Sequence, residues 1–368
     1  MQKIIGVIGA GTMGNSIGAL FASRGFRTFV YDNNAEALER GKNNALKSLS
    51  RLKMEDTSSN LIFTSSMKDL SGCSFIVEAV PEVLEIKREV YRDLENIVPV
   101  SAIFASNTST IPISDLSDSL SKKERLIGTH FFNPPIIMPL VEVVRGRNTS
   151  DDTLQTTTRL MSDIGKKYVV ISKEVPGFIV NRINARAFYE TFSLIDEGYS
   201  PEEIDFATRN VLGFPMGMCE LIDFVGLDVI YYGTRELMDR GFNTEMNRSL
   251  EGMFKEKRWG VKTGYGFYKY DAPGRYRKIN LNEADIKRKV DPLRIIAGAI
   301  NEAAWLADNG VSSQNEIDEA MKLAMNWPYG PFAYLDRFGR AAVIAELQDL
   351  YDRYGKSWYR PSELLSRA

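Results

Sequence analysis

The chain opens with a glycine-rich turn set between two short apolar segments. Residues 3–8 (KIIGVI) run directly into residues 9–14 (GAGTMG), and a helical pattern of apolar residues begins at Ile17. A second apolar segment, residues 28–31, ends in Asp32. This order of strand, glycine turn and helix constrains the fold strongly, because the turn needs backbone conformations and close approaches that glycine allows.

The turn has the G-x-G-x-x-G spacing of dinucleotide-binding folds. Its first glycine would permit the tight turn, the second would let a pyrophosphate approach the backbone amides, and the third would let helix and strand pack. Asp32 would accept hydrogen bonds from the adenosine ribose and repel a 2′-phosphate, which predicts NAD rather than NADP. Its alternative role is the N-cap of a helix over residues 35–38. The predicted cofactor-binding residues here are Gly9, Gly11, Thr12, Met13, Gly14 and Asp32.

Apolar segments alternate with polar, helical segments through the first half of the chain. The predicted strands are residues 75–80, 102–105, 126–131, 140–144 and 167–171, and residues 83–97 are typical of a helix. Such alternation indicates a mostly parallel sheet covered by helices on both faces, a doubly wound α/β domain. After Pro176 the pattern becomes helical throughout. We therefore predict a Rossmann-type domain over residues 1–176, followed by all-α domains.

The helical half contains an internal repeat. Residues 203–226 (EIDFATRNVLGFPMGMCELIDFVG) align with residues 316–339 (EIDEAMKLAMNWPYGPFAYLDRFG) at a constant offset of 113 residues. Glutamate, aspartate, proline and glycine match in register. We predict a helical substrate domain over residues 177–285 and a degenerate copy of it over residues 286–368, whose purpose is packing.

Composition excludes several functional classes. Acidic and basic residues nearly cancel, with a net charge of −2, which gives no general attraction to nucleic acid or to an acidic membrane. No apolar segment approaches the roughly 20 residues of a membrane span, and the N-terminus lacks the pattern of a signal peptide. Cys73 and Cys219 form no CxxC pair and are expected to be free thiols. We expect a cytoplasmic protein without a metal site.

The single histidine of the chain is the first candidate for catalysis. His130 lies in GTHFFNPP (residues 128–135) at the end of an apolar strand, and strand ends line the ligand crevice of open α/β sheets. Glu142 interrupts the apolar strand LVEVV (residues 140–144), where a buried carboxylate needs a partner. That partner is a backbone amide, an arginine such as Arg145, or His130. In the last case the carboxylate would orient a base that takes the proton of an alcohol.

Two further polar segments have the same character. SNTST (residues 106–110) follows a predicted strand, and PGFIVNR (residues 176–182) begins the long helix at the domain junction. As ordinary structural residues, Asn107 and Ser109 would shape a turn, and Asn181 would cap or bridge helices.

The whole set of motifs resembles the 3-hydroxyacyl-CoA dehydrogenase family. The glycine turn, VEAVPE (77–82), SNTST, GTHFFNPP, LVEVV, PGFIVNR, GFPMGMCELIDFVGLD (213–228) and KTGYGFYKY (262–270) occur in family order. The resemblance covers residues 1–270, and the repeat extends it to about residue 360. It implies a C-terminal half of the 6-phosphogluconate-dehydrogenase-like type, in the form with a duplicated helical domain.

The resemblance also implies roles for individual residues. His130 would be the base, Glu142 its partner, and Ser109 and Asn181 would position the substrate. Ser109 would hydrogen-bond the 3-hydroxyl, and Asn181 would hold the reacting acyl group. The implied cofactor-side contacts are Glu82, Lys87, Asn107, Asn133 and Lys262. Without the resemblance, Glu82 and Lys87 would be an ordinary surface pair and Lys262 a solvated charge.

The implied reaction is oxidation of an L-3-hydroxyacyl-CoA by NAD, in fatty-acid β-oxidation or short-chain hydroxybutyryl-CoA metabolism. The implied partner is a small acyl-CoA substrate, and the chain would be a monomer or a homodimer. Two alternatives stay open: a related hydroxyacid or sugar-acid dehydrogenase, and a non-catalytic, crystallin-like NAD-binding protein. Arg186 and Met218 depart from the family pattern and bear on helix packing. The segment between Asp32 and Phe75 is shorter than in the family, so no CoA-contacting residue is assigned.

Overall fold

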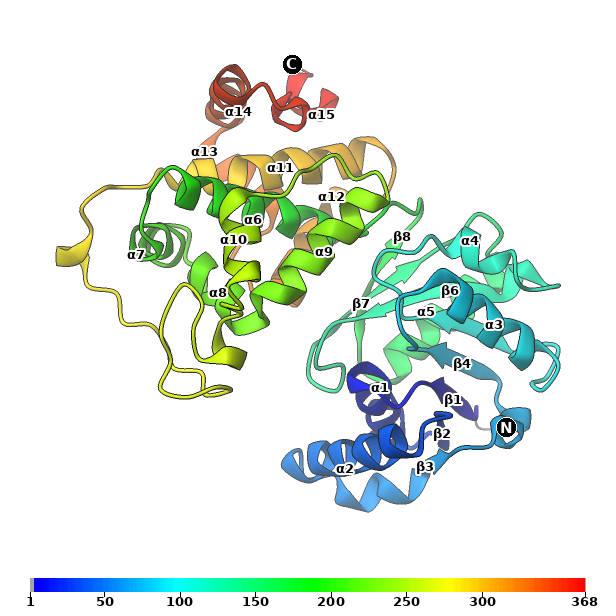
Figure 1. The fold of residues 1–368 in the computed structure, drawn as a ribbon. Helices are drawn as coiled ribbons and strands as arrows, with labels where there is room; N and C mark the ends of the chain where they lie inside the picture. The colour runs from blue at the N-terminus through cyan, green and yellow to red at the C-terminus, as the bar shows by residue number, and fades with distance from the viewer. Residues whose placement is uncertain (1–2, 368) are drawn as a thin grey trace. The chain divides into compact units, whose positions relative to one another are not determined.

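The computed structural model describes residues 3–367, apart from the side chain of Asp285, and the chain divides into two compact units, residues 1–178 and 179–368. The sequence placed the first boundary between residues 176 and 177. The predicted boundary between residues 285 and 286 stays a prediction. The first unit is an α/β domain and the second is helical (Figure 1), so the predicted fold class is confirmed.

The first unit is built on one eight-stranded sheet in the order β3-β2-β1-β4-β5-β6-β7-β8. The strands β1 to β6 are parallel, whereas β7 pairs antiparallel with β6 and parallel with β8. Their bounds are Ile5–Ile8, Thr28–Tyr31, Leu61–Thr64, Phe75–Glu78, Ile103–Ser106, Leu126–Phe131, Leu140–Val144 and Lys167–Ile171. The strand order reverses at β1 and β4, where such folds bind their ligands.

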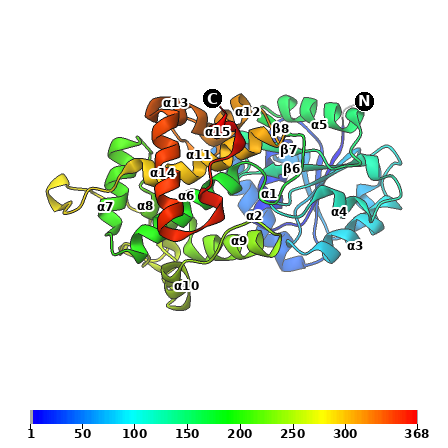
Figure 2. The same ribbon diagram turned by 90° about the horizontal axis from the view of Figure 1, so that it is seen from above.

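Helices cover both faces of this sheet. The apolar side chains of α1 and α5 share one core cluster with alternate residues of the strands, among them Phe131 and Val141. On the opposite face Tyr91 of α3 packs edge-on against Phe104 of β5. Figure 2 shows α5 and α3 on opposite sides of the sheet. The helices are α1 (Thr12–Ser23), α2 (Ala35–Arg51), α3 (Leu84–Glu95), α4 (Ile113–Ser117) and α5 (Asp151–Asp163).

One strand is absent from the sequence-based prediction. Strand β3 has four residues, LIFT, all of them half-buried, and it lies between two short 3₁₀ helices, Glu55–Asn60 and Met67–Gly72. Among the strands of the described residues it pairs with β2 alone, at the edge of the sheet. A short edge strand shows neither the continuous apolar run of a central strand nor a clear alternation, so the pattern does not mark it.

The second unit consists of ten α-helices within the described residues. They are α6 (Val180–Asp196), α7 (Pro201–Phe206), α8 (Met218–Val225), α9 (Leu227–Asp239), α10 (Arg248–Lys255), α11 (Pro292–Asp308), α12 (Gln314–Met325), α13 (Pro331–Phe338), α14 (Arg340–Tyr354) and α15 (Glu363–Ser366). Helices α6 and α11 lie against each other. Arg186, one of the departures from the family pattern, donates to Glu302 of α11 across this contact. None of the helices in residues 3–367 is long and apolar enough to cross a bilayer.

The two copies of the repeat use the same local devices. Helix α7 begins with a Ser200–Glu203 capping box, and α12 begins with the same box made by Ser313 and Glu316. The carboxylate of Asp205 accepts from two backbone amides in the first turn of α8, and that of Asp318 accepts from two in the first turn of α13. Each pair of equivalent residues is 113 positions apart, so the offset found in the sequence relates equivalent contacts.

Candidate active site

The glycine turn between β1 and α1 has the geometry of a dinucleotide-binding turn. Gly9 has φ +97°, and a Cβ there would lie 2.7 Å from the carbonyl oxygen of Ala79. A Cβ on Gly14 would lie 1.8 Å from the carbonyl oxygen of Gly9, so helix and strand pack too closely for a side chain. At Gly11, by contrast, a Cβ would meet no atom within 4 Å. The backbone at Gly11 is therefore open to a ligand.

A cavity of about 670 Å³ adjoins this turn. Its wall includes Gly9, Gly11, Thr12, Met13 and Asp32, five of the six residues predicted from the turn motif and the end of β2. The remaining wall is largely apolar and comes mainly from residues 79–81 after β4 and from α3, with single residues from β1, β2, α2 and the 3₁₀ helix Met67–Gly72. A pocket at the helix N-terminus, at the point where the strand order reverses, fits a dinucleotide.

Asp32 lies at the end of β2 and faces the glycine turn. Its carboxylate accepts from the backbone amide of Ala10 at 2.8 Å and from that of Asn34 at 2.9 Å. The N-cap of α2 is Asn34, whose side chain accepts from Ala37. The alternative role of Asp32 as the helix N-cap is therefore wrong.

His130 and Glu142 are direct cross-strand neighbours on β6 and β7. The Nδ1 atom of His130 lies 2.6 Å from Oε2 of Glu142, and both residues are buried, Glu142 completely. Because Phe131 and Val141 point to the α1–α5 core, alternation turns His130 and Glu142 to the other face. The rings of Phe132 and Phe178 lie beside the imidazole, with centroids 4.7 and 5.8 Å away. The structure shows the imidazole as a partner of Glu142.

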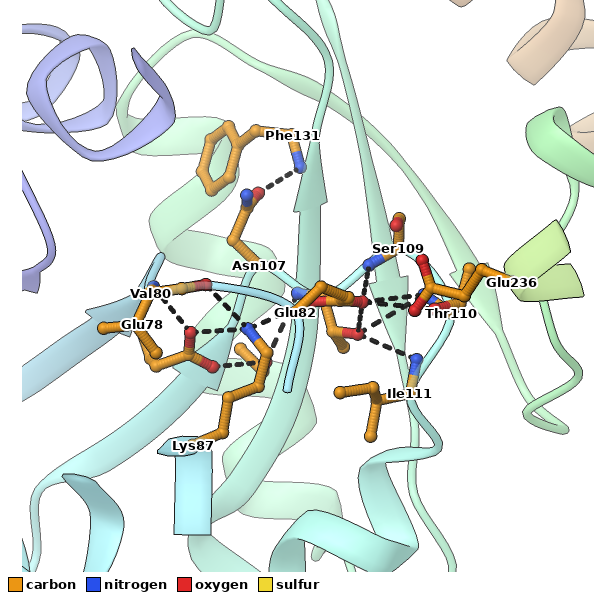
Figure 3. Close-up of polar contacts among 12 residues, drawn as sticks. Glu78, Val80, Glu82, Lys87, Asn107, Ser109, Thr110, Ile111, Phe131 and Glu236 are labelled. Carbon is orange, nitrogen blue, oxygen red and sulfur yellow. Dashed lines mark hydrogen bonds and ion pairs between the residues drawn. The ribbon is translucent and has the colours of Figure 1, made fainter. Parts of the chain in front are cut away.

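Asn107 joins the ends of two neighbouring strands. It follows β5, its backbone amide donates to the carbonyl of Glu78 on β4, and its side-chain oxygen accepts from the amide of Phe131 at 2.9 Å. Figure 3 shows this contact between the segment after β5 and the strand that carries His130. Asn107 thus ties the SNTST segment to the histidine strand.

Glu82 and Lys87 belong to a polar network in which Lys87 is buried and Glu82 is partly buried. The ammonium of Lys87 is 1% exposed and lies 2.6 Å from Glu78 and 3.1 Å from Glu82. Glu82 accepts in turn from the backbone amides of Ser109 and Thr110 at 3.0 and 3.2 Å (Figure 3). The alternative prediction of an ordinary surface pair is wrong, because α3 places Lys87 under the SNTST segment.

The charges in this network stabilise one another. Burial works to raise the pKa of Glu82, but the nearby Lys87 and the hydrogen bond from Thr108 outweigh it, so the pKa is lowered. Burial works to lower the pKa of Lys87, but the carboxylates of Glu78 and Glu82 outweigh it, so the pKa is raised. Lysine and glutamate therefore hold their charges in a buried setting.

The loop between β6 and β7 carries Asn133, another predicted contact. Asn133 is exposed and precedes Pro134 through a cis peptide bond. Lys166 stabilises this loop, because its ammonium donates to the carbonyl oxygens of Pro135 and Met138 at 2.6 and 2.5 Å. Ser16 of α1 accepts from the amide of Ile136 at 3.2 Å.

The two remaining predicted residues belong to the second unit. Asn181 is half-buried in the first turn of α6. Lys262 follows α10 in the KTGYGFYKY segment and pairs with Asp228 of α9 at 2.6 Å. Lys262 is exposed and has a carboxylate partner, so its alternative role as a solvated charge stays a prediction.

Sequence reasoning overlooked several residues of the network. They are Glu78, Tyr91, Ser106 and Thr108, and all four are buried. Tyr91 and Ser106 donate to the carboxylate of Glu78, and Thr108 donates to that of Glu82. One signal was available: Glu78 ends the apolar strand FIVE, just as Glu142 interrupts LVEVV. In both places a carboxylate in a buried strand needs polar partners.

Comparison with known protein families identifies the class. Residues 4–175 match the family described as 3-hydroxyacyl-CoA dehydrogenase, NAD binding domain. Residues 177–270 and 293–368 match the description 3-hydroxyacyl-CoA dehydrogenase, C-terminal domain. The chain belongs to the 3-hydroxyacyl-CoA dehydrogenase family, as the motifs predicted, and its first unit is a nicotinamide-dinucleotide-binding domain.

Individual relatives agree with this assignment. The chain is 34% identical to the fatty acid oxidation complex subunit alpha of Psychrobacter arcticus, over 98% of this chain and 54% of the relative. It thus spans about half the length of the curated relatives it matches. The 3-hydroxybutyryl-CoA dehydrogenase of Escherichia coli K12 aligns over 100% of this chain and 98% of its own, with TM-score 0.88 and 28% identity. The (S)-3-hydroxybutyryl-CoA dehydrogenase of Ralstonia eutropha is 33% identical and aligns with TM-score 0.69 over 74% of this chain and all of its own.

Proposed function

We propose that this chain oxidises an L-3-hydroxyacyl-CoA to the 3-oxoacyl-CoA with NAD, and reduces it in the reverse direction with NADH. The observation that carries the proposal is the 2.6 Å contact between His130, near the end of β6, and Glu142, in the middle of β7. The names of the relatives support a place in fatty-acid oxidation or hydroxybutyryl-CoA metabolism.

The cofactor site fits a nicotinamide dinucleotide. The open backbone at Gly11, the first turn of α1 and the adjoining cavity would hold the pyrophosphate and adenosine, and Asp32 would accept from the ribose hydroxyls. When bound, the nicotinamide supplies the acceptor for the hydride of the substrate. The carboxylate of Asp32 would repel a 2′-phosphate, which favours NAD over NADP.

His130 acts as the general base in this proposal. A carboxylate only accepts hydrogen bonds, so Glu142 holds the proton of the neutral imidazole on Nδ1 and leaves the Nε2 lone pair for the 3-hydroxyl proton. As the proton arrives, the imidazolium gains a buried counter-ion 2.6 Å away. Burial strengthens this interaction, because little water screens it.

The other predicted residues take supporting roles. Ser109 would hydrogen-bond the 3-hydroxyl or the developing oxyanion, and Asn181 would hold the acyl group. Glu82, Lys87, Asn107, Asn133 and Lys262 are proposed as cofactor-side contacts. The free, buried thiols of Cys73 and Cys219 support a reducing compartment, the cytoplasm.

The test is NADH oxidation with acetoacetyl-CoA by the wild type and by His130→Gln. We expect the variant to lose roughly 10²–10⁴-fold in kcat, the range of general-base catalysis, while it still binds NADH. Near-normal turnover by His130→Gln overturns the role of the histidine. Free acetoacetate, assayed beside the thioester, separates a CoA dehydrogenase from a hydroxyacid dehydrogenase. Absence of turnover with both, despite NADH binding, would favour a non-catalytic NAD-binding protein.

A further inference from the structure

A completely buried carboxylate, Glu78, lies at the end of β4 outside every role assigned so far. It accepts from Lys87 at 2.6 Å, Ser106 at 2.8 Å, Tyr91 at 3.0 Å and the backbone amide of Val80 at 2.9 Å. Four donors around one carboxylate offset the cost of burying its charge. Figure 3 shows Glu78 next to Lys87, on the side away from Ser109.

Lys87 connects this carboxylate to a second one. Its ammonium is 1% exposed and is shared between Glu78, at 2.6 Å, and Glu82, at 3.1 Å. The side chain of Glu82 is 25% exposed, so the chain of charges leads from the core toward the surface. A lysine held between two carboxylates has a fixed position, since movement toward one weakens its interaction with the other.

Glu82 gathers the segment that carries Ser109. A single oxygen, Oε1, accepts from the amides of Ser109 and Thr110 at 3.0 and 3.2 Å and from the hydroxyl of Thr108. Thr108 in turn accepts from the amide of Ile111 at 2.8 Å. Several donors bind the same carboxylate oxygen, and this fixes the backbone of residues 108–111. The fixed backbone in turn sets the direction of the Ser109 side chain.

We propose that Glu78 is a positioning residue, which sets the place of Ser109 through Lys87 and Glu82. The inference rests on the proposed function, in which Ser109 hydrogen-bonds the 3-hydroxyl. Without the charge of Glu78, Lys87 keeps one carboxylate partner and draws Glu82 toward itself. Glu82 then holds the amides of residues 109 and 110 less well, and Ser109 loses its fixed position relative to the base.

The test compares Glu78→Gln with the wild type. Glutamine keeps the shape of the side chain and removes its charge. We expect kcat with acetoacetyl-CoA to fall roughly ten- to a hundredfold, the loss that a misplacement of about 1 Å causes. The dissociation constant of NADH should change less than kcat, because Glu78 is not in the wall of the dinucleotide cavity, although its partner Lys87 and Glu82 are proposed cofactor-side contacts. A matched control is Glu95→Gln. Glu95 is the last residue of α3 and pairs with Arg125, so its replacement also removes a paired charge and should leave kcat unchanged.

A double-mutant cycle separates positioning from general stability. If Glu78 acts through Ser109, then Glu78→Gln causes no further loss of kcat in a Ser109→Ala background. An equal loss in both backgrounds, or wild-type kcat in Glu78→Gln, overturns the proposal. If Ser109→Ala and His130→Gln both retain wild-type kcat, the proposed function itself fails. If both are slow and Glu78→Gln is normal, only the positioning role fails.

A milder variant covers the case in which Glu78→Gln does not fold. Tyr91→Phe removes one donor to Glu78 and preserves the packing of the ring against Phe104. A fall in kcat that disappears in the Ser109→Ala background supports the proposal. Unchanged kcat in a folded Tyr91→Phe protein overturns it.

Discussion

The imidazole of His130 and the carboxylate of Glu142 face each other across two antiparallel strands, with Nδ1 and Oε2 at 2.6 Å. Neither residue is on a flexible loop. Their mutual position is set by the hydrogen-bonded ladder of β6 and β7 within the sheet, and both backbones are buried. The proposed base and its partner, held in this way, would need little reorganisation when the proton moves.

Replacing Glu142 by Gln removes the counter-ion and preserves the shape of the side chain. We expect kcat to fall roughly 10²–10⁴-fold, as when the orienting carboxylate of a catalytic triad is lost. The double variant with His130→Gln should be no slower than His130→Gln alone, because the pair acts as a unit. Steady-state kinetics with acetoacetyl-CoA decide this, and multiplicative losses would show that Glu142 acts independently of the histidine.

Asp32→Asn should relax the choice of cofactor. The variant keeps an oxygen to accept from Ala10 and loses the charge that would face a 2′-phosphate. We expect the ratio of kcat/KM for NADPH to that for NADH to rise at least roughly tenfold, since a like-charge contact costs about 1.4 kcal/mol or more. The exposed cap residue Asn34, replaced by Ala, is the control and should leave the ratio unchanged. An unaltered ratio in Asp32→Asn would show that the charge of Asp32 does not determine the preference for NADH over NADPH.

Gly217 and Gly330 should be equally intolerant of a side chain. A Cβ at these positions would lie 2.1 Å from Cγ of Asp205 and 2.2 Å from Cγ of Asp318. We expect Gly217→Ala and Gly330→Ala each to lower the free energy of unfolding by about 1–3 kcal/mol, the typical cost of overpacking. Gly233→Ala in α9, where a Cβ meets nothing within 4 Å, should be neutral or slightly stabilising. Urea denaturation compares the three, and a stable Gly330→Ala would contradict the equivalence of the copies.

Lys166 should make stability depend on pH in the alkaline range. Burial, with the charge of Arg24 adding to it, lowers the pKa of Lys166 from 10.5 to about 8. Between these two pH values the unfolded chain binds more protons at this group than the folded chain does. The contribution of Lys166 to the free energy of unfolding therefore rises as the pH increases from 8 to 10.5, and it is lost as the pH falls through 8. The stability of the wild type should therefore increase relative to Lys166→Met across this window.

Urea denaturation at a series of pH values tests this expectation. The exposed neighbour Lys167, replaced by Met, provides the matched control. A constant difference in unfolding free energy between the wild type and Lys166→Met from pH 8 to pH 10 would contradict the lowered pKa.

The sequence alone predicted the parts of the fold that have strong local signals. The glycine turn and the continuous apolar segments indicated the central strands, because a strand buried on both faces is apolar throughout. Strand β3 was not predicted, because its half-buried residues at the sheet edge have no such pattern. His130 and Glu142 could be paired from the chain, since a carboxylate in an apolar strand is rare enough to demand a partner.

The network around Glu78 could not be assembled in the same way. The local sequence predicts that Lys87 is an ordinary exposed lysine on a helix. The packing of α3 on the sheet is what buries it. Glu82 and the SNTST segment are more than twenty residues apart, and their contacts depend on how β4 and β5 lie side by side. Contacts of this kind follow from tertiary packing and leave little trace in local patterns.

The cross-strand position of the proposed base carries a consequence for insertions and deletions. Residues 132–139 form a connecting loop, and loops usually tolerate changes of length as long as the strands beside them keep their register. A deletion within β7 before Glu142 is different, because shifting the strand by one residue would turn Glu142 toward the α1–α5 core and bring a valine opposite His130. Changes of length among natural homologues should therefore accumulate in residues 136–139, after the GTHFFNPP motif, whereas the spacing within each strand is held constant by geometry.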